Sequence, residues 1–252
     1  MEKHNVTTQK TLNSRRFRNV KVSSAIWLNS KMRRIFLTGE ELIDFSPLYP
    51  GQWVMVRVVD ASGIHNESRA YTIRNYNCDE GILVIDFVIH GHGPLSLWAL
   101  NASTGDSVQV SNPRSSFKVS QDSDWLFLAG DETGLPAILA IMEKCPSHLK
   151  ITAFIEVSSR QEAHKFDCSS NWSLTWLVRQ PNITHGVLLE KAVEIHKWGK
   201  GNGQIWISCE SKIIKRLRKY LIEQKMFSKS ELHLSGYWKE GVSDEREELS
   251  DY

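Results

Sequence analysis

The first half of the chain alternates short apolar runs with turn residues. The runs are rich in Val, Ile, Phe and Trp and cover 17–26, 33–37, 52–59, 70–74, 82–89 and 107–111. Turn residues such as Pro50-Gly51 and Gly105-Asp106 separate them. About six strands at this spacing are typical of an antiparallel barrel or sandwich. One helix is expected among them, beginning near Pro94.

A different rhythm begins near Asp124. A strand of the buried type is expected over 125–129, and it leads through a turn at Gly130 to a helix over 135–144. Further strands are expected over 151–157, 174–178, 204–208 and 231–238, with a helix over 212–225. Because strands and helices alternate, the pattern favours an open, mostly parallel sheet with flanking helices.

The predicted fold class is therefore a β-barrel plus an α/β domain. We assign residues 1–120 to an N-terminal antiparallel barrel and residues 121–239 to the open, mostly parallel sheet. Residues 240–252 are mostly acidic with a single Arg246, and we expect them to form a flexible tail. Such a pair of domains suits a redox enzyme with one cofactor in each part, although other functions use similar pairs.

Composition and charge exclude several function classes. Of 252 residues, 41% are hydrophobic and 24% are charged, as in ordinary globular proteins. The net charge of +2 does not indicate a nucleic-acid partner. The basic run Lys212–Lys219 carries apolar residues at helical spacing, so its cations are expected on a solvent face. No run of about 18 apolar residues occurs, so we expect no membrane-spanning segment.

Four cysteines are widely scattered: Cys78, Cys145, Cys168 and Cys209. No pair has CxxC spacing, and no cluster has the spacing of an iron–sulfur or zinc site, so we expect reduced thiols and no bound metal. The segment Met1–Thr8 lacks the apolar core of a secretory signal. Together these features predict a cytoplasmic protein.

The segment Arg69-Ala70-Tyr71-Thr72-Ile73-Arg74 places a cation, an aromatic ring and a hydroxyl on one expected strand. Side chains alternate along a strand, so Arg69, Tyr71 and Ile73 share one face while Thr72 and Arg74 share the other. Such a strand end offers a guanidinium to phosphate and a ring to a flat ligand, as a flavin nucleotide requires. Tyr and Thr are also ordinary strand residues, so this segment alone does not decide.

A second segment, Asp86-Phe87-Val88-Ile89-His90-Gly91-His92-Gly93-Pro94-Leu95-Ser96, joins an expected strand to the expected helix. Helix N-termini carry unpaired N–H groups that suit a pyrophosphate, and glycines allow close backbone approach. A plain strand–turn–helix connection with Ser96 as a cap explains the same pattern. His90 and His92 have no third metal ligand nearby in the sequence.

A third segment, Gly130-Asp131-Glu132-Thr133-Gly134-Leu135-Pro136, connects the buried strand to the next helix. Ligands of open α/β sheets bind beyond the carboxyl ends of strands, where this turn is expected. It lacks the G-x-G-x-x-G fingerprint, so a Rossmann dehydrogenase of the usual kind is not indicated. Near the end of the chain, Gly236-Tyr237-Trp238 offers two rings that suit either a planar ligand or a core.

In order, these segments resemble the motifs of the siderophore-interacting protein family, the FAD-containing ferric-siderophore reductases of the ferredoxin-reductase superfamily. Arg69–Arg74 is similar to the family's R-x-Y-T-x-R, and Asp86–Ala99 to its D-F-x-x-H-G…W-A. Gly130–Ile138 is similar to G-D-E-T-x-L-P-A-I, and Gly236–Trp238 to G-Y-W. The resemblance runs from about Arg16 to Gly241 and covers nearly the whole chain.

The resemblance implies an FAD site formed by Arg69, Tyr71, Thr72, His90 and Ser96. It implies that Tyr71 lies against the isoalloxazine and Arg69 near phosphate. It also implies that Thr133 lies where the two cofactors meet, and that Glu210 stands at the Glu of a W-x-x-G-E segment.

Two departures from the family pattern concern backbone contacts. Cys209 replaces a glycine before Glu210, and Asn112-Pro113-Arg114-Ser115 stands where the family has G-P-R-G. Glycine allows the closest approach of backbone to a ligand, so tight contacts at Cys209, Asn112 and Ser115 are in question.

The choice of nicotinamide cofactor depends on Ser158-Ser159-Arg160, which follows the strand expected over 151–157. An acidic residue there would accept ribose hydroxyls, whereas Arg160 can pair with a 2′-phosphate. A surface Arg is the competing interpretation. We expect NADPH, with NADH as the alternative.

The predicted function is an NAD(P)H-dependent flavin oxidoreductase that reduces Fe(III) to Fe(II) in a ferric siderophore or other ferric chelate and releases iron in the cytoplasm. FAD carries the redox chemistry, so no catalytic side chain is assigned. Ferric chelates are often anionic, and the candidates for a basic rim are Lys239, Arg57 and Arg114. Two alternatives stay open: a general flavin reductase or diaphorase with a protein acceptor, and a non-catalytic siderophore-binding protein. A ferredoxin-like protein is the alternative electron donor.

Overall fold

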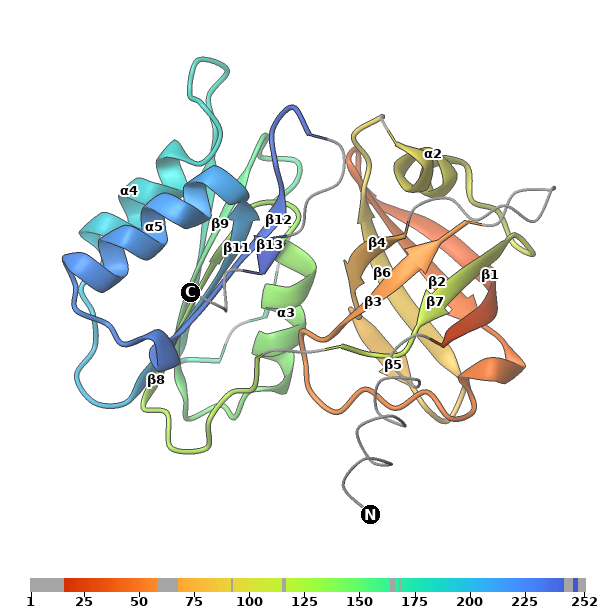
Figure 1. Cartoon of the computed structure of the whole chain (residues 1–252), viewed down its shortest axis with the longest axis horizontal. Helices are drawn as coiled ribbons and strands as arrows, with labels where there is room; N and C mark the ends of the chain where they lie inside the picture. The colour runs from red at the N-terminus through yellow and green to blue at the C-terminus, as the bar shows by residue number, and fades with distance from the viewer. Residues whose placement is uncertain are drawn as a thin grey trace, which may run out of the picture. The chain divides into compact units, whose positions relative to one another are not determined.

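The computed structural model describes residues 16–58, 68–91, 93–114, 117–163, 166–167, 169–242 and 247–248. The chain divides into two compact units, Met1–Ser116 and Phe117–Tyr252. The division falls a few residues before the boundary that we expected at residue 120. Each unit is built around its own sheet, and most of the strands and helices are labelled in Figure 1.

Unit 1 is an antiparallel sheet. Its strands are β1 (Phe17–Asn29), β2 (Met32–Thr38), β3 (Trp53–Arg57), β4 (Arg69–Thr72), β5 (Asn75–Asn77), β6 (Ile82–Val88) and β7 (Ser107–Ser111). They lie in the order β4-β3-β7-β1-β2-β6-β5, and every pairing is antiparallel. The short 3-10 helix η1 (Glu40–Leu42) follows β2.

The sheet closes into a barrel where β4 leads into β5. The N–H of Ile73 donates to the carbonyl of Gln52 beside β3, at 2.8 Å. The N–H of Arg74 donates to the carbonyl of Val84 in β6, at 2.9 Å. The chain therefore crosses from one edge of the sheet to the other between these two residues, which is why β4 ends at Thr72 rather than at Arg74 as expected.

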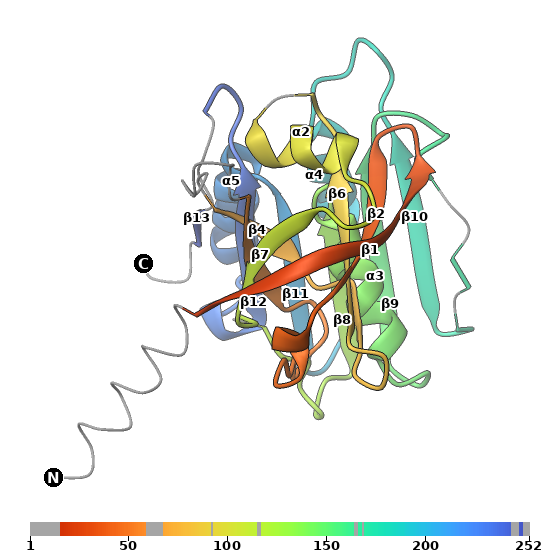
Figure 2. The ribbon, with the colours of Figure 1, turned by 90° about the vertical axis from the view of Figure 1, so that its right-hand side faces the viewer.

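The barrel interior is filled by alternate side chains of its strands, as the period of two requires. Ile35 and Leu37 of β2 and Leu83, Ile85 and Phe87 of β6 are fully buried. Helix α2 (Pro94–Asn101) covers one end of this barrel (Figure 2). Arg33 of β2 fixes the end of α2, because its guanidinium donates to the carbonyls of Ala99 and Ala102, at 2.8 Å each.

Unit 2 is an open, mostly parallel sheet, as predicted. Its strands are β8 (Trp125–Gly130), β9 (Lys150–Val157), β10 (Trp172–Val178), β11 (Gly203–Glu210), β12 (Leu232–Trp238) and β13 (Glu247–Glu248). The order is β10-β9-β8-β11-β12-β13, and only β13 is antiparallel to its neighbour. After β8 the chain adds β9 and β10 on one side of it and then β11 and β12 on the other, so the strand order switches between β8 and β11. Ligands are expected beyond the carboxyl ends of the two strands at this switch point.

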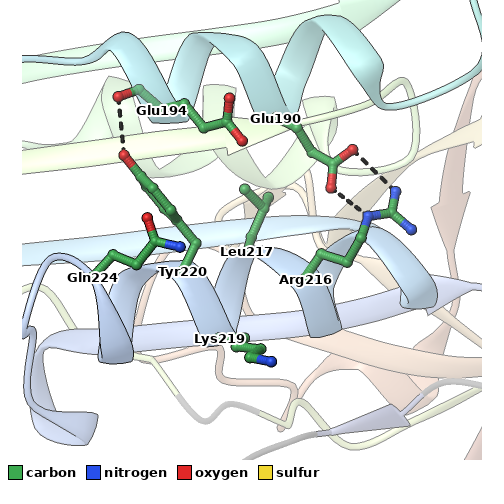
Figure 3. A pocket seen from close by; sticks show the side chains of 7 residues that line it. All are labelled: Glu190, Glu194, Arg216, Leu217, Lys219, Tyr220 and Gln224. Atoms are coloured by element: carbon green, nitrogen blue, oxygen red, sulfur yellow. Dashed lines mark hydrogen bonds and ion pairs between the residues drawn. The ribbon is translucent and has the colours of Figure 1, made fainter.

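Three helices and one 3-10 turn cover this sheet: α3 (Leu135–Lys144), α4 (Val187–Ile195), α5 (Ser211–Glu223) and η2 (Lys229–Glu231). Helix α3 lies on one face of the sheet, while α4 and α5 lie together on the other (Figure 1). Phe127, Ala129, Ile205 and Ile207 pack against the α4 and α5 face in one buried cluster. Between the two helices, Arg216 donates to Glu190 at 2.6 and 3.0 Å (Figure 3).

The sequence prediction missed β5 and α4. Strand β5 is only three residues long and half polar, and α4 has nine residues of which three are buried, so neither gives a strong periodic signal. In the tail that we expected to be flexible, β13 pairs with Ser235 and Gly236 of β12. Within the described residues, no helix is long and apolar enough to cross a membrane.

Candidate functional site

The first candidate site lies in unit 1, around Tyr71 of β4. The Tyr71 ring centroid is 4.3 Å from that of Phe87 in β6, and Phe87 is 5.7 Å from Trp98 in α2. Tyr71 is half-buried, whereas the neighbouring Thr72 is buried. Burial raises the pKa of the Tyr71 hydroxyl above its usual range, against the opposing charge of Arg69. Tyr71 therefore presents a neutral aromatic ring next to a cation.

Asp86 joins two of the sequence motifs. Its carboxylate is 5% exposed and accepts two hydrogen bonds from Arg34, at 2.7 and 2.8 Å. The guanidinium of Arg74 lies 3.8 Å from the same carboxylate. Since Arg74 follows β4 directly and Asp86 belongs to β6, this ion pair fixes the strand that carries Tyr71 to the strand that carries Phe87.

The turn between β6 and α2 is held by Ser96. Its buried hydroxyl accepts a hydrogen bond from the N–H of His90, at 3.1 Å, while the His90 side chain is exposed. Gly91 and Gly93 have φ angles of 76° and 78°, in the left-handed region that glycine occupies without strain. Gly93 is the N-cap of α2, and no side chain caps this helix in the described part of unit 1.

These features fit FAD. The first turn of α2 presents N–H groups that no side chain of the described residues caps, which suits a pyrophosphate. Arg69 supplies a permanent positive charge, and Tyr71 supplies a ring for a planar group. All of the FAD residues implied by the sequence, Arg69, Tyr71, Thr72, His90 and Ser96, belong to β4, the end of β6 and α2. Their assignment stays a prediction.

The expected basic rim is divided between the two units. Trp53 of β3 pairs with both Thr72 and Arg114, so Arg114 lies beside the Thr72 end of β4, with its guanidinium 5.4 Å from the Trp53 ring. Arg57, at the other end of β3, packs 3.7 Å from the Phe17 ring centroid and donates to Gln109 at 2.8 Å.

Burial lowers the pKa of Arg57. Lys239 follows β12 in unit 2. Ser115, one of the replaced glycine positions, lies outside the described residues, as do His92 and Cys168.

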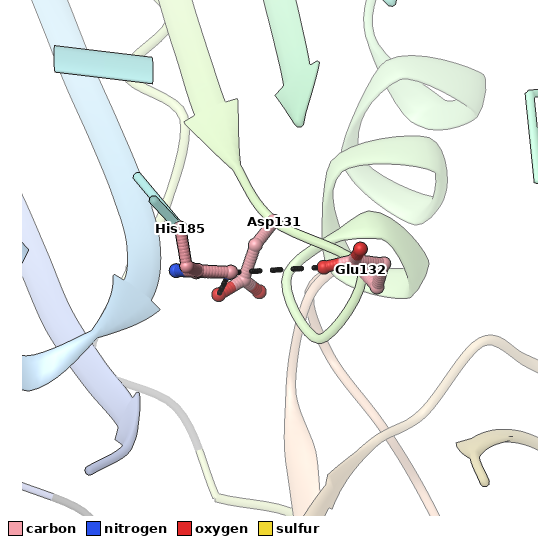
Figure 4. A group of neighbouring side chains, drawn as sticks. All are labelled: Asp131, Glu132 and His185. Carbon is pink, nitrogen blue, oxygen red and sulfur yellow. Dashed lines mark ion pairs between the residues drawn. The ribbon is translucent and has the colours of Figure 1, made fainter. Parts of the chain in front are cut away.

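The second candidate site lies at the carboxyl end of β8, where Asp131 is fully buried (Figure 4). One carboxylate oxygen accepts hydrogen bonds from the N–H of Thr133 at 2.8 Å and from its hydroxyl at 2.5 Å. The other accepts the indole N–H of Trp238 at 2.8 Å and lies 3.4 Å from Nε2 of His185. Asp131 therefore ties together the turn after β8, the end of β12 and the loop before α4.

The charges of this cluster follow from its contacts. Burial alone would lower the pKa of His185, but the carboxylates of Asp131 and Glu132, 3.4 and 3.8 Å from its Nε2, raise it to about 9. Burial alone would raise the pKa of Asp131, but the neighbouring His185, with hydrogen bonds from Thr133 and Trp238, keeps it below its usual value. At neutral pH an imidazolium therefore faces two carboxylates.

Arg179 completes the charge balance. It forms an ion pair with Glu132, and its guanidinium lies 3.0 Å from the buried carboxylate of Glu156. Glu156 also accepts the N–H groups of Gly186 and Leu189 at the start of α4, at 2.7 and 2.8 Å.

Asp131, Glu132 and His185 have ligand atoms within 4.8 Å of one another, as a metal site requires. The positive charge is already supplied by Arg179 and protonated His185, so the arrangement indicates a charged network rather than a cation site.

Glu210 acts as the cap of α5. Its buried carboxylate accepts the N–H groups of Lys212 and Ile213, at 2.6 and 3.2 Å, and that of Glu240 at 3.2 Å. The adjacent Cys209 side chain is buried in the apolar cluster beneath α4 and α5. The residue that replaces the family glycine is therefore accommodated in the core.

Arg160 is exposed in the turn after β9. The two hydroxyls before it, expected to assist a phosphate, both donate to the buried carboxylate of Glu162, in the case of Ser159 at 3.1 Å. Of the three side chains Ser158, Ser159 and Arg160, Arg160 is therefore the one suited to bind a 2′-phosphate.

The sequence interpretation assigned no role to Asp131 and Glu132, although it quoted them, and it missed Glu156, Arg179 and His185 entirely. Residues 179–186 have no periodicity and match no motif. Only the order of the strands brings this loop to Asp131, so no local signal could have identified His185.

The two units together have the ferredoxin-reductase-like fold. A ferredoxin NADP+ reductase from Neisseria gonorrhoeae, solved with bound FAD and NADP, has a TM-score of 0.68 and 14% identity to this chain. The match covers 88% of this chain and 99% of that one. At this identity the likeness shows the fold alone.

The family follows from closer matches. The model of the siderophore-interacting FAD-binding domain matches residues 58–117, and that of the siderophore-interacting protein matches residues 123–241. Ferric vibriobactin reductase ViuB of Vibrio cholerae is 31% identical over 238 residues, 87% of this chain and 88% of that protein.

A siderophore utilization protein from T. fusca has a TM-score of 0.84 at 28% identity, covering 91% of this chain and 95% of that one. The chain belongs to the siderophore-interacting protein family, and it is an FAD-binding oxidoreductase. The expected family and fold class are confirmed.

Proposed function

We propose that this protein is a ferric-siderophore reductase that uses NAD(P)H to reduce chelated Fe(III) to Fe(II). The observation that carries the proposal is the geometry of the candidate flavin site in unit 1. There the Asp86–Arg74 ion pair holds the ring of Tyr71 and the uncapped start of α2 in one part of the barrel. The names of relatives, among them ferric vibriobactin reductase, support a ferric siderophore as the substrate class.

The residues of unit 1 bind and orient the flavin in this proposal. Bound FAD would supply the conversion of a hydride into single electrons for Fe(III). Tyr71 presents a neutral ring to the isoalloxazine, and Arg69 places a positive charge near phosphate. The N–H groups at the start of α2 donate to the pyrophosphate, and Ser96 holds the His90 turn in the shape that leaves them accessible.

Unit 2 would bind the nicotinamide nucleotide at the carboxyl ends of β8 and β11. Thr133 is fixed there by two hydrogen bonds to Asp131, and Glu210 shapes the neighbouring end of β11 by capping α5. The buried charges of Asp131 and Glu132 are offset by His185 and Arg179. This balance limits the negative potential that would repel an anionic dinucleotide.

NADPH is the proposed donor, with NADH as the alternative. Arg160 is exposed at the end of β9, the second strand of the unit, where a 2′-phosphate or a 2′-hydroxyl is distinguished in such sheets. A guanidinium pairs with a phosphate through two hydrogen bonds, which a ribose hydroxyl cannot match.

The iron would remain in its chelator throughout. Fe(II) is held less tightly than Fe(III) by hard oxygen donors, so reduction releases the iron without cleavage of the organic ligand. Arg57, Arg114 and Lys239 are proposed to raise the local concentration of an anionic chelate. Such a reaction places the protein in the cytoplasm, where NAD(P)H is available.

The proposal is tested with the FAD-loaded protein under anaerobic conditions. NADPH or NADH is added first, and loss of the visible absorbance of the oxidised flavin reports hydride transfer. A ferric catecholate, a ferric hydroxamate or ferric EDTA is then added, and return of the flavin spectrum with formation of Fe(II) is expected. Bleached flavin that ferric chelates leave unchanged, but a ferredoxin-like acceptor reoxidises, would favour a diaphorase instead.

A further inference from the structure

The positive charge of this protein is concentrated in one stretch of unit 2. Residues 187–231 contain ten Lys and Arg and five Glu, whereas the whole chain has 31 Lys and Arg against 29 Asp and Glu. The rest of the chain therefore carries a net negative charge. The reductase proposal uses none of these basic residues.

Helix α5 turns its basic residues outward. Ile213, Ile214 and Leu217 are buried against the sheet, while Lys212, Lys215 and Lys219 are exposed. Their spacing of three and four residues places these three lysines on one side of the helix. The outer side of α5 therefore carries three exposed lysines, followed by the exposed Glu223 in its last turn.

Two apolar side chains lie at the end of this surface. The Tyr220 hydroxyl donates to the carbonyl of Glu194, at 3.0 Å, so the last turn of α5 contacts the end of α4 (Figure 3). Ile195, the last residue of α4, is 70% exposed, and Met226, three residues after α5, is 80% exposed. Lys197 and Lys225, both exposed, flank them. Exposed apolar groups rimmed by lysines are typical of a surface that binds something.

Met226 occupies a position that would be more stable as glycine. Its φ angle is 61°, in the left-handed region, and among the described residues no other non-glycine residue has a positive φ. The N–H of Phe227 donates to the carbonyl of Leu221 at 3.1 Å, the hydrogen bond of a helix end whose left-handed residue is usually glycine. The turn lets Phe227 pack against Trp198, with ring centroids 4.9 Å apart. The packing of Phe227 requires this turn, but glycine would form the turn as well as methionine does.

We propose that the outer side of α5, with Ile195 and Met226 at its end, docks this protein on an anionic phospholipid surface. The lysines would lie against phosphate headgroups, and the two apolar side chains would enter the interfacial layer. A cationic side alone would suit an acidic protein equally. The exposed Met226 and Ile195 favour lipid, because a bilayer surface supplies negative charge and an apolar layer together. The inference does not depend on the proposed reductase activity.

The test is cosedimentation of the full-length protein with large unilamellar vesicles. Vesicles of phosphatidylcholine alone are compared with vesicles containing phosphatidylglycerol, at low salt and at high salt. We expect binding only to the anionic vesicles, and loss of binding at high salt because the exposed charges are then screened.

Three variants separate charge, apolar contact and folding. Lys212→Gln with Lys219→Gln should reduce partitioning about 25-fold, since each basic residue near an anionic surface contributes roughly fivefold. Met226→Gln should weaken binding at unchanged thermal stability. Met226→Gly should weaken binding while slowing urea-dependent amide hydrogen exchange of peptides from α5, because glycine adopts the positive φ of this position without strain. The matched control, Lys21→Gln with Lys144→Gln, removes two exposed lysines elsewhere and should bind as the wild type does.

Several results would overturn the proposal. One is equal binding of the protein to neutral and anionic vesicles, and another is no binding to anionic vesicles at low salt. A third is an equal loss of binding in the α5 double variant and in the control double variant. Binding to polyglutamate without binding to anionic vesicles would reassign the surface to an acidic protein and would also refute docking on lipid.

Discussion

Replacing His185 by Gln tests the charged network at the end of β8. In the folded protein the pKa of His185 is raised from 6.5 to about 9, although burial opposes the rise, because Asp131 and Glu132 stabilise the imidazolium. That difference corresponds to roughly 3 kcal/mol of folding free energy at 1.36 kcal/mol per pKa unit. The His185 side chain is 23% exposed, so solvent screens only part of this interaction.

The sign of the pH dependence follows from linkage. A group whose pKa is raised on folding stabilises the protein fully below its unfolded value and loses that contribution as pH rises through the folded value. Wild-type unit 2 should therefore exceed His185→Gln in stability by roughly 3 kcal/mol below pH 6.5. The difference should shrink as pH rises through about 9 and should be lost above it.

The assay is urea-dependent amide hydrogen exchange of peptides from β8 and β12, measured from pH 6 to 10. Peptides report unit 2 separately, which a whole-chain melting curve of a two-unit protein does not. His148→Gln, in the exposed turn after α3, is the matched control and should have little effect. A pH-independent difference, or a difference that disappears near pH 6.5, would refute the proposed contact of His185 with the two carboxylates.

Three further predictions concern the cofactor sites. Tyr71→Ala should weaken FAD binding roughly tenfold while Tyr71→Phe retains it, because the ring rather than the hydroxyl makes the contact; flavin fluorescence titration measures both. Asp86→Asn should destabilise unit 1 by about 3 kcal/mol and release FAD, since it removes the carboxylate shared by Arg34 and Arg74; urea unfolding and flavin retention measure this. Arg160→Ala should raise KM for NADPH by roughly tenfold or more and leave KM for NADH unchanged in steady-state kinetics.

The Asp86 prediction has a matched control variant, and the other two have outcomes that would contradict them. For Asp86, the control is Asp44→Asn, because Asp44 also pairs with two arginines but is 54% exposed and should contribute less. Equal loss of FAD from the Ala and Phe variants of Tyr71 would remove the ring contact from the proposal. An equal rise of KM for NADPH and for NADH would show that Arg160 does not bind the 2′-phosphate.

The two segments that carry the flavin motifs show how far local patterns lead. Alternation along Arg69–Arg74 correctly placed Tyr71 on a strand, and the glycines before Pro94 correctly marked the turn into a helix. The same alternation extended β4 too far, because closure of the barrel turns the chain at Ile73 and Arg74. The ion pair between Arg74 and Asp86 links two motifs 12 positions apart, and the sequence gives no sign that they meet.

The sequence by itself determined which elements form and which family they belong to. Periods of two and of about 3.6 residues are local properties, and the four motifs lie in the chain in their family order. The tertiary structure alone decided which charges meet. Asp131, His185 and Trp238 are separated by about 50 residues each. They converge because the carboxyl ends of β8 and β12, on either side of β11, meet the loop before α4 at the same edge of the sheet. The helix ends show the same division: periodicity predicts α5, but only the folded structure shows that its last turn contacts the end of α4.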